Sequence, residues 1–229
     1  MIDYSFLNTI MKIDIHRHAK DPGTAKRVIR NLFHDQSPDV NSKQYYSIGL
    51  HPWHVNASSL NEDIKRVKEI AKNKQVIAIG ETGLDKSIKV PYDIQVKAFS
   101  AQIEIAAEFN KPVIIHCVKA YNEIFSLRIS SKNMAPWIIH WFNASREMGE
   151  QLISKNFYLS FGHMLFNKKS KAYNAFTKLP EDRIFFETDD AGYTIDEVYE
   201  QAALLRELNI TKLEKQIETN FVSCFGIQP

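Results

Sequence analysis

Two histidines separated by one residue, His16 and His18, stand in the segment KIDIHRH near the start of the chain. Ile13 and Ile15 alternate there with polar residues, which is the period of a β-strand. On an extended strand both imidazoles project from one face, about 6–7 Å apart. Neutral imidazoles that converge in this way suit a divalent metal ion, but this pair needs further ligands.

Other residues of ligand type follow apolar runs further along the chain. The run QVIAIG is followed by Glu81, PVIIH ends in His116, WIIH ends in His140, and RIFF is followed by Glu187 and Asp189. Such apolar runs are typical of strands that are buried on both faces of a parallel sheet. Because the carboxyl ends of parallel strands in a barrel share one rim, we expect these side chains to converge there.

The number of ligands indicates more than one metal ion. Tetrahedral zinc takes four ligands, and the strand ends offer a larger set: His16, His18, Glu81, His116, His140 and Asp189. Two divalent ions about 4 Å apart, with a carboxylate between them, match this set. Histidine-rich ligation favours Zn, whereas phosphodiester chemistry often uses Mg or Mn, so the sequence leaves the identity of the metal open.

Segments of strand type and helix type alternate along the chain, which predicts a parallel sheet. Strands are expected at residues 12–18, 45–50, 75–80, 112–115, 137–139, 157–160 and 183–186, and helices at 60–72, 93–110, 123–131, 145–154, 169–177 and 195–208. The segment RVIRNLF, residues 27–33, is either an abbreviated second strand or a turn of helix. The predicted fold class is therefore α/β, a (β/α)8 TIM-type barrel.

The composition is that of a globular protein, with 229 residues, 44% hydrophobic and 24% charged. No linker or repeat divides the chain, so residues 1–229 are expected to form a single barrel domain, with residues 1–11 as a short N-terminal extension. No apolar run approaches the roughly 18 residues of a membrane span, and the N-terminus is too short for a signal peptide. Cys117 and Cys224 show no disulfide pattern, which favours a reducing, cytoplasmic location.

Seven motifs together carry a resemblance to a known family. They are DIHRH, GLHPW, GETGLD, KPVIIHC, IIHWF, ETD and the terminal TNFVSCFG. In these motifs the chain resembles the TatD-type metal-dependent deoxyribonucleases, which belong to the amidohydrolase-like metal-dependent hydrolase superfamily. The resemblance implies that the six residues named above are the metal ligands and that Glu81 bridges two ions. It further implies that Asp189 accepts a proton from the attacking water.

The chain departs from the family pattern at three places. The interval from His18 to Gly49 is short, Lys86 stands where an aromatic residue is usual, and IHC is followed by Val118 instead of an arginine. Lys119, one position further on, is expected to supply that cation. These departures leave the metal ligands intact and concern the substrate.

Four residues are assigned to substrate binding: His51, Trp53, Lys119 and Trp141. His51 follows the strand YYSIGL, and it either contacts substrate or is fixed in a turn by Pro52. Lys119 either contacts phosphate or belongs to a solvated surface. The two tryptophans either stack on bases or pack at the rim.

The sequence therefore predicts a metal-dependent phosphodiesterase with two divalent ions, which hydrolyses single-stranded DNA from an end. Bound metal polarises the phosphoryl group and acidifies water, and Glu81 and Asp189 are the expected catalytic carboxylates. DNA is the expected partner, although the net charge of +2 by itself argues neither for nor against a nucleic acid. No membrane and no obligate protein partner are expected. The alternatives are a hydrolase of a small ester, lactone or amide, and a metal-binding scaffold without turnover.

Overall fold

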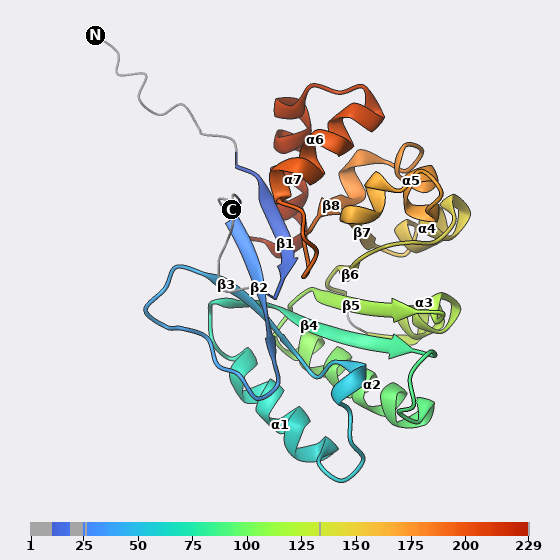
Figure 1. The fold of residues 1–229 in the computed structure, drawn as a ribbon. Coiled ribbons are helices and arrows are strands. Elements are labelled where there is room, and N and C mark those ends of the chain that lie inside the picture. Colours follow the sequence, from blue (N-terminus) through green and yellow to red (C-terminus); the bar gives the residue numbers. More distant parts are fainter. Residues whose placement is uncertain (1–10, 19–24, 26, 133, 229) are drawn as a thin grey trace.

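Eight parallel strands follow one another around a single sheet in chain order (Figure 1). The computed structural model describes residues 11–18, 25, 27–132 and 134–228. The strands are β1 Ile13–Arg17, β2 Arg27–Phe33, β3 Tyr45–Gly49, β4 Val76–Asp85, β5 Val113–Val118, β6 Trp137–Ile139, β7 Phe157–Phe161 and β8 Ile184–Phe186. A parallel bridge between Arg17 and Asp189 joins the first strand to the residues after the last, so the sheet forms a nearly closed barrel.

Helices follow most of the strands and cover the outside of the barrel. The α-helices are α1 Leu60–Ala71, α2 Tyr92–Glu108, α3 Tyr121–Ser130, α4 Arg146–Ile153, α5 Lys171–Phe176, α6 Ile195–Arg206 and α7 Ile210–Phe225; the 3-10 helices are η1 Pro52–His54, η2 His163–Phe166 and η3 Glu181–Arg183. The six predicted helices are confirmed, with ends that differ by a few residues. The predicted TIM-type barrel is confirmed as well.

The segment RVIRNLF is a strand, and the expectation that this second strand is abbreviated is wrong. β2 has 7 residues, and all but the first two pair with β3, from Ile29 opposite Tyr45 to Phe33 opposite Gly49. The connections are what is short, because residues 34–44 join β2 to β3 without a helix. Residues 19–24 and 26, between β1 and β2, and residues 1–10 of the expected extension lie outside the described residues.

Helix α7, which the sequence analysis did not predict, packs beside the first strands. Its buried residues Leu213, Ile217 and Phe221 recur every four positions, and the Phe221 ring stacks on Tyr45 of β3 at 6.4 Å. Figure 1 shows α7 next to β1. The helix thus covers the part of the barrel where the described connections provide no helix, and it holds β1 and β8 together. Within the described residues, no helix is long and apolar enough to span a membrane.

Candidate metal centre

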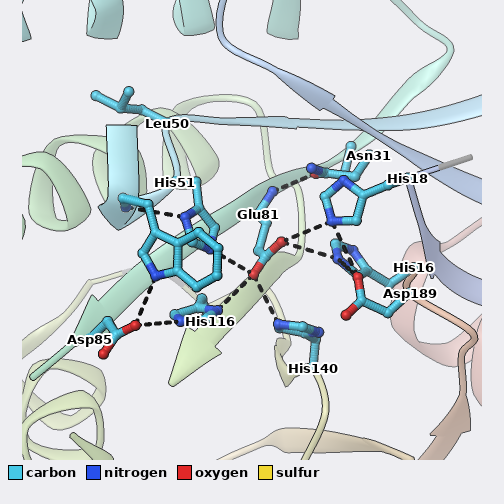
Figure 2. A network of polar contacts seen from close by, with 12 residues as sticks. His16, His18, Asn31, Leu50, His51, Glu81, Asp85, His116, His140 and Asp189 are labelled. Carbon is cyan, nitrogen blue, oxygen red and sulfur yellow. Dashed lines mark hydrogen bonds and ion pairs between the residues drawn. The ribbon is translucent and has the colours of Figure 1, made fainter. Parts of the chain in front are cut away.

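Glu81 occupies the middle of the centre, and it arrives from within a strand (Figure 2). The sequence analysis ended this strand at Gly80, but β4 continues to Asp85. The register against β5 shifts between Ile79 and Thr82, so an extra residue bulges out of the ladder and turns Glu81 into the barrel mouth. The backbone N–H of Glu81 donates to Asn31 Oδ1 on β2 at 2.6 Å.

Two glycines of the GETGLD motif make this bulge possible. Gly80 and Gly83 have φ angles of 146° and 147°, which side-chain-bearing residues rarely adopt. A Cβ atom at Gly83 would lie 2.1 Å from the carbonyl oxygen of His116, and one at Gly80 would lie 2.4 Å from that of Ile114. The motif therefore lets β4 approach β5 closely enough to set Glu81 beside His116.

The two carboxylate oxygens of Glu81 face two different sets of imidazoles. Oε2 lies 3.2 Å from Nε2 of His16 and 3.5 Å from Nε2 of His18. Oε1 lies close to three ring nitrogens: 2.8 Å from His116 Nδ1, 2.9 Å from His140 Nε2 and 3.1 Å from His51 Nε2. A carboxylate between two imidazole sets has the arrangement that a bridging ligand requires.

Asp189 joins the first of these sets from the opposite edge of the sheet. Its Oδ1 lies 3.2 Å from Nε2 of His18 and 3.7 Å from Nε2 of His16. The backbone N–H of Asp189 donates to the carbonyl of His16 at 2.9 Å, which fixes the residue against β1. The residue has a left-handed φ of 53°, a conformation that costs free energy and recurs at functional sites.

The donor atoms present fit divalent metal ions. One ligand atom from each of His16, His18 and Glu81 can lie within 4.8 Å of the others, and the same holds for His51, Glu81 and His116. Imidazole nitrogen and carboxylate oxygen are the ligands that zinc takes, and manganese accepts both. His51, which the sequence analysis assigned to substrate, is thus among the candidates for ligation. His140 and Asp189 lie outside these two groups, although each contacts a member of one.

The charges of this cluster are balanced between imidazoles and carboxylates. Burial opposes the ionised form of Glu81, but the nearby imidazoles of His140, His116 and His16 hold its pKa well below the ordinary value. Burial also opposes protonation of His18, but hydrogen bonds and charges of Asp189 and Glu81 raise its pKa to about 9. Burial lowers the pKa of His51, and the contact with Glu81, which acts in the opposite direction, offsets this effect only in part.

Further polar residues hold the imidazoles from outside. The Nδ1 atom of His140 lies 3.4 Å from Glu187 Oε1, and that same oxygen accepts the backbone N–H of Trp141 at 2.6 Å. His116 Nε2 lies 3.3 Å from Asp85 Oδ2, which also accepts the indole N–H of Trp53 at 2.8 Å. Carboxylates that contact the outer nitrogen of an imidazole orient the ring and raise its basicity as a ligand.

Two glutamines of α2 fix the backbone on which His51 and Asp85 stand. Gln102 accepts the N–H of Leu50 at 2.8 Å and donates to Thr82 Oγ1 at 2.6 Å. Gln95, two helical turns earlier on the same face, accepts the N–H of Asp85 at 2.8 Å. Both side chains are buried, so α2 contributes hydrogen bonds as well as packing to the centre.

A cavity of about 380 Å³ opens beside His116 and His140. Lys119, Trp141, Tyr121, Asn143 and Met164 contribute to its lining. The structure therefore brings the two predicted substrate residues Lys119 and Trp141 to the same cavity, next to the imidazoles. The Trp53 ring also lies beside His116, with the two ring centroids 5.9 Å apart.

Several residues of the centre were not identified from the sequence. Asn31, Gln95 and Gln102 act through backbone contacts, and nothing in their local sequence distinguishes them from polar residues of a strand or a helix. Glu187 was identified from the sequence as a residue of ligand type after the apolar run RIFF and as part of the ETD motif, but without a role. Its placement after an apolar run was the one available signal, and this signal did not indicate that Glu187 would contact His140 and Trp141.

The class of protein is defined by eight parallel strands with imidazoles and carboxylates gathered at their carboxyl ends. The crystal structure of YjjV, a TatD homologue from Escherichia coli, has the same fold: it superposes with a TM-score of 0.82 over 94% of this chain and 98% of that chain, at 19% identity. A TatD family hydrolase from Entamoeba histolytica superposes with a TM-score of 0.76 over 94% of this chain and 98% of that chain, at 14% identity.

Sequence comparison assigns the family. The family described as TatD related DNase matches residues 25–226, and the chain belongs to it. The chain is 33% identical to the Bacillus subtilis metal-dependent hydrolase YabD over 200 residues, which cover 80% of this chain and 78% of YabD. It is 28% identical to the 3'-5' ssDNA/RNA exonuclease TatD of Shigella flexneri over 193 residues, which cover 77% and 71% of the two chains.

Proposed function

We propose that this protein is a two-metal phosphodiesterase that removes nucleotides from an end of single-stranded DNA. The observation that carries the proposal is the position of Glu81, whose two oxygens face separate imidazole sets. The exonuclease name of the TatD relatives supports the choice of a nucleic acid as substrate. Zn, Mg and Mn are the candidate ions.

The described side chains divide into two ligand sets that share Glu81. His16, His18 and Asp189 would hold one ion, and His116 and His140 would hold the other. His51 lies 3.1 Å from Glu81, beside the second set, where it either completes the ligation or contacts the substrate. Divalent ions in these positions supply Lewis-acid activation of the phosphoryl group and of water.

Asp189 is the proposed proton acceptor. Burial opposes its charge, but the hydrogen bond with His18 and the nearby rings of His16 and His140 lower its pKa. The carboxylate is therefore ionised near neutral pH and able to take a proton from water. Lys119 and Trp141, on the wall of the adjoining cavity, hold the substrate's phosphate and base, and Trp53, whose ring also neighbours His116, contacts the substrate as well.

We also propose that the protein works in the cytoplasm without an obligate protein partner. Both cysteines of the chain are free, which suits a reducing compartment. Burial raises the pKa of the Cys117 thiol to about 12, so this thiol, which adjoins His116, is protonated near neutral pH in the metal-free protein.

The test is a substrate panel with metal-reconstituted protein. We expect Zn-, Mg- or Mn-loaded protein to shorten an end-labelled single-stranded octamer one nucleotide at a time and to leave a blunt duplex intact. Labels at the 5' and 3' ends, on separate samples, give the polarity. Cleavage of esters, lactones or amides with no cleavage of any oligonucleotide would assign the small-molecule hydrolase instead. Bound metal without turnover of either class would assign the scaffold.

A further inference from the structure

Four aromatic side chains run outward from the centre along the carboxyl ends of β6, β7 and β8. The Trp141 ring lies 6.4 Å from His140 and meets His163 of η2 edge-on at 4.9 Å. His163 is parallel to Tyr193 at 6.3 Å, and Tyr193 stacks on Phe166 at 4.3 Å. We call these four residues, Trp141, His163, Tyr193 and Phe166, the rim row.

The rim row exposes aromatic surface that the barrel does not need for its own packing. Trp141 and Tyr193 are each 38% exposed, although most large aromatic residues of this chain are buried. Neighbouring exposed aromatic rings on one surface mark a binding site more often than isolated ones do. The row begins at a centre residue, so whatever binds it continues from the proposed active site.

The segments that carry the row are fixed by hydrogen bonds. Gln201 of α6 donates to the carbonyl of Leu165 in η2 at 3.1 Å, and Ser170 Oγ donates to that of Met164 at 2.8 Å. Tyr193 directly precedes Thr194, which begins α6 with a capping box. The rings are therefore held in place before any ligand arrives, which lowers the entropic cost of binding.

Exposed lysines follow the row in the chain. Lys168, Lys169 and Lys171 come shortly after Phe166 and are all exposed. None of them forms an ion pair with a carboxylate among the residues that the structure describes. Planar rings together with exposed ammonium groups that follow them closely in the chain fit a flexible polyanion with planar bases, because stacking and phosphate contacts are the two ways proteins hold single strands.

We propose that the rim row stacks successive bases of the single strand whose end lies at the metal centre. The proposal rests on the function proposed above and adds the path of the substrate. Trp141 meets the base nearest the scissile phosphate, and Tyr193 with Phe166 meets a base further along. The row accepts every base, since each has a stacking face, so the protein is expected to lack sequence preference along this path.

The proposal predicts that Tyr193 matters for a strand and not for a small phosphodiester. With metal-loaded protein, Tyr193→Leu should raise KM for octathymidylate about tenfold, which corresponds to about 1.4 kcal/mol and to one base–aromatic stack. Hydrolysis of bis(p-nitrophenyl) phosphate should stay within about twofold, because that substrate is too short to reach Tyr193. Tyr193→Phe should retain the wild-type KM, and Tyr92→Leu, at a tyrosine of α2 that is 36% exposed, is the matched control.

An abasic substrate makes the test specific for stacking. In a series of octamers, a single abasic sugar replaces a different nucleotide in each. At one position of the abasic sugar, KM for wild-type protein should rise by the same factor as Tyr193→Leu raises KM for the intact octamer. On that abasic octamer, Tyr193→Leu should not raise KM further, because the stacking interaction between Tyr193 and the base is already absent. Additive losses, or equal losses on the octamer and on bis(p-nitrophenyl) phosphate, would overturn the stacking role.

The outcomes separate this proposal from the function on which it rests. If wild-type protein cleaves the octamer and Tyr193→Leu leaves its KM unchanged, the rim row is not the path of the strand, and the nuclease assignment stands. If wild-type protein cleaves no oligonucleotide, both fail together. Replacing Lys168 and Lys169 by Gln should flatten the salt dependence of octamer binding by about 0.7 per lost phosphate contact.

Discussion

The indole N–H of Trp53 donates a 2.8 Å hydrogen bond to Asp85 Oδ2, and this oxygen also lies 3.3 Å from Nε2 of His116. The Trp53 side chain is 60% exposed, yet this bond fixes its ring beside the centre. Trp53 can therefore both pack at the rim and contact substrate, because the hydrogen bond to Asp85 anchors the ring while much of the side chain stays exposed to a ligand.

Trp53→Phe tests this coupling because it keeps an aromatic ring and removes the indole donor. We expect a loss of about 0.5–1.5 kcal/mol in the free energy of unfolding, measured by urea denaturation. Asp85→Ala should cost more, because it also frees His116. In the double variant the two losses should be less than additive. Full additivity would show that the bond contributes nothing to the folded state.

Glu81→Gln tests the bridging role. A neutral amide cannot balance the charge between two cations, so the variant should hold one ion less per chain by mass spectrometry and lose at least about a hundredfold in kcat. The exposed residue Glu104 of α2 offers the matched control Glu104→Gln, which should change neither quantity. Two retained metals together with wild-type turnover would refute the bridge.

The metal-free protein should become less stable as the pH rises from about 6.5 to 9. The His18 imidazole has its pKa raised from 6.5 to about 9, so its contribution is complete below the unfolded value and disappears as the pH passes the folded value. The expected loss in unfolding free energy is on the order of 2 kcal/mol. It can be measured by thermal unfolding of the protein in EDTA at a series of pH values. His18→Gln should flatten this part of the pH profile.

Metal affinity should change in the opposite direction over the same pH range. A cation binds the neutral imidazole, so each ion that binds near His18 must displace its proton. Calorimetry in buffers of different ionisation enthalpy should therefore detect proton release near pH 7.5, from His18 and also from His140, whose pKa is likewise raised. A pH-independent affinity between pH 6.5 and 9 would show that His18 takes no part in ligation.

Lys119 should hold a phosphate of the substrate outside the ligand shell. Lys119→Gln should raise KM for an oligonucleotide and reduce the slope of log affinity against log salt by about 0.7, with little effect on a small chromogenic phosphodiester. Because Lys119 has a left-handed φ of 55°, the variant keeps a side chain of similar shape so that the backbone cost is unchanged. Lys119→Arg should restore the slope; equal losses on both substrates would assign Lys119 to the chemistry or the fold.

Asn31 should be required for the position of Glu81. Its Oδ1 accepts the Glu81 N–H at 2.6 Å and the Ser47 hydroxyl at 3.0 Å, and all three groups are buried. Asn31→Ala leaves both donors unpaired and should cost about 2–4 kcal/mol in unfolding free energy. Metal affinity should fall as well, whereas Asn61→Ala, at an exposed position of α1, should leave it unchanged.

The convergence of the candidate ligands could be predicted from the sequence where these residues follow apolar strands directly. His16, His18, His116, His140 and Asp189 all converge, because strand ends in a parallel barrel share one rim. Glu81 converged for a different reason, since its strand continues past it and only a bulge turns it inward. Periodicity gives no sign of a bulge, although the glycines of GETGLD were a cue that a single sequence leaves ambiguous.

The remaining differences come from interactions between distant segments. Asn31 contacts Glu81 fifty residues away in the chain, and Gln102 fixes Leu50, so neither role has a local signature. Helix α7 does have a local signature, since Leu213, Ile217 and Phe221 recur at helical spacing and are buried. The strand assignment of residues 27–33 depended on β3, which supplies its pairing partner.

The junction between β1 and the residues after β8, where the barrel closes, has a consequence for how the protein folds during synthesis. His16 lies in the first strand and His18 directly follows it, whereas Asp189 follows the last strand and contacts them only when β8 docks beside β1. A nascent chain on the ribosome therefore carries the two imidazoles long before their carboxylate partner emerges. Because contacts so distant in sequence form late in folding, the complete ligand set arises together with barrel closure, and an unfinished chain has no site of this kind.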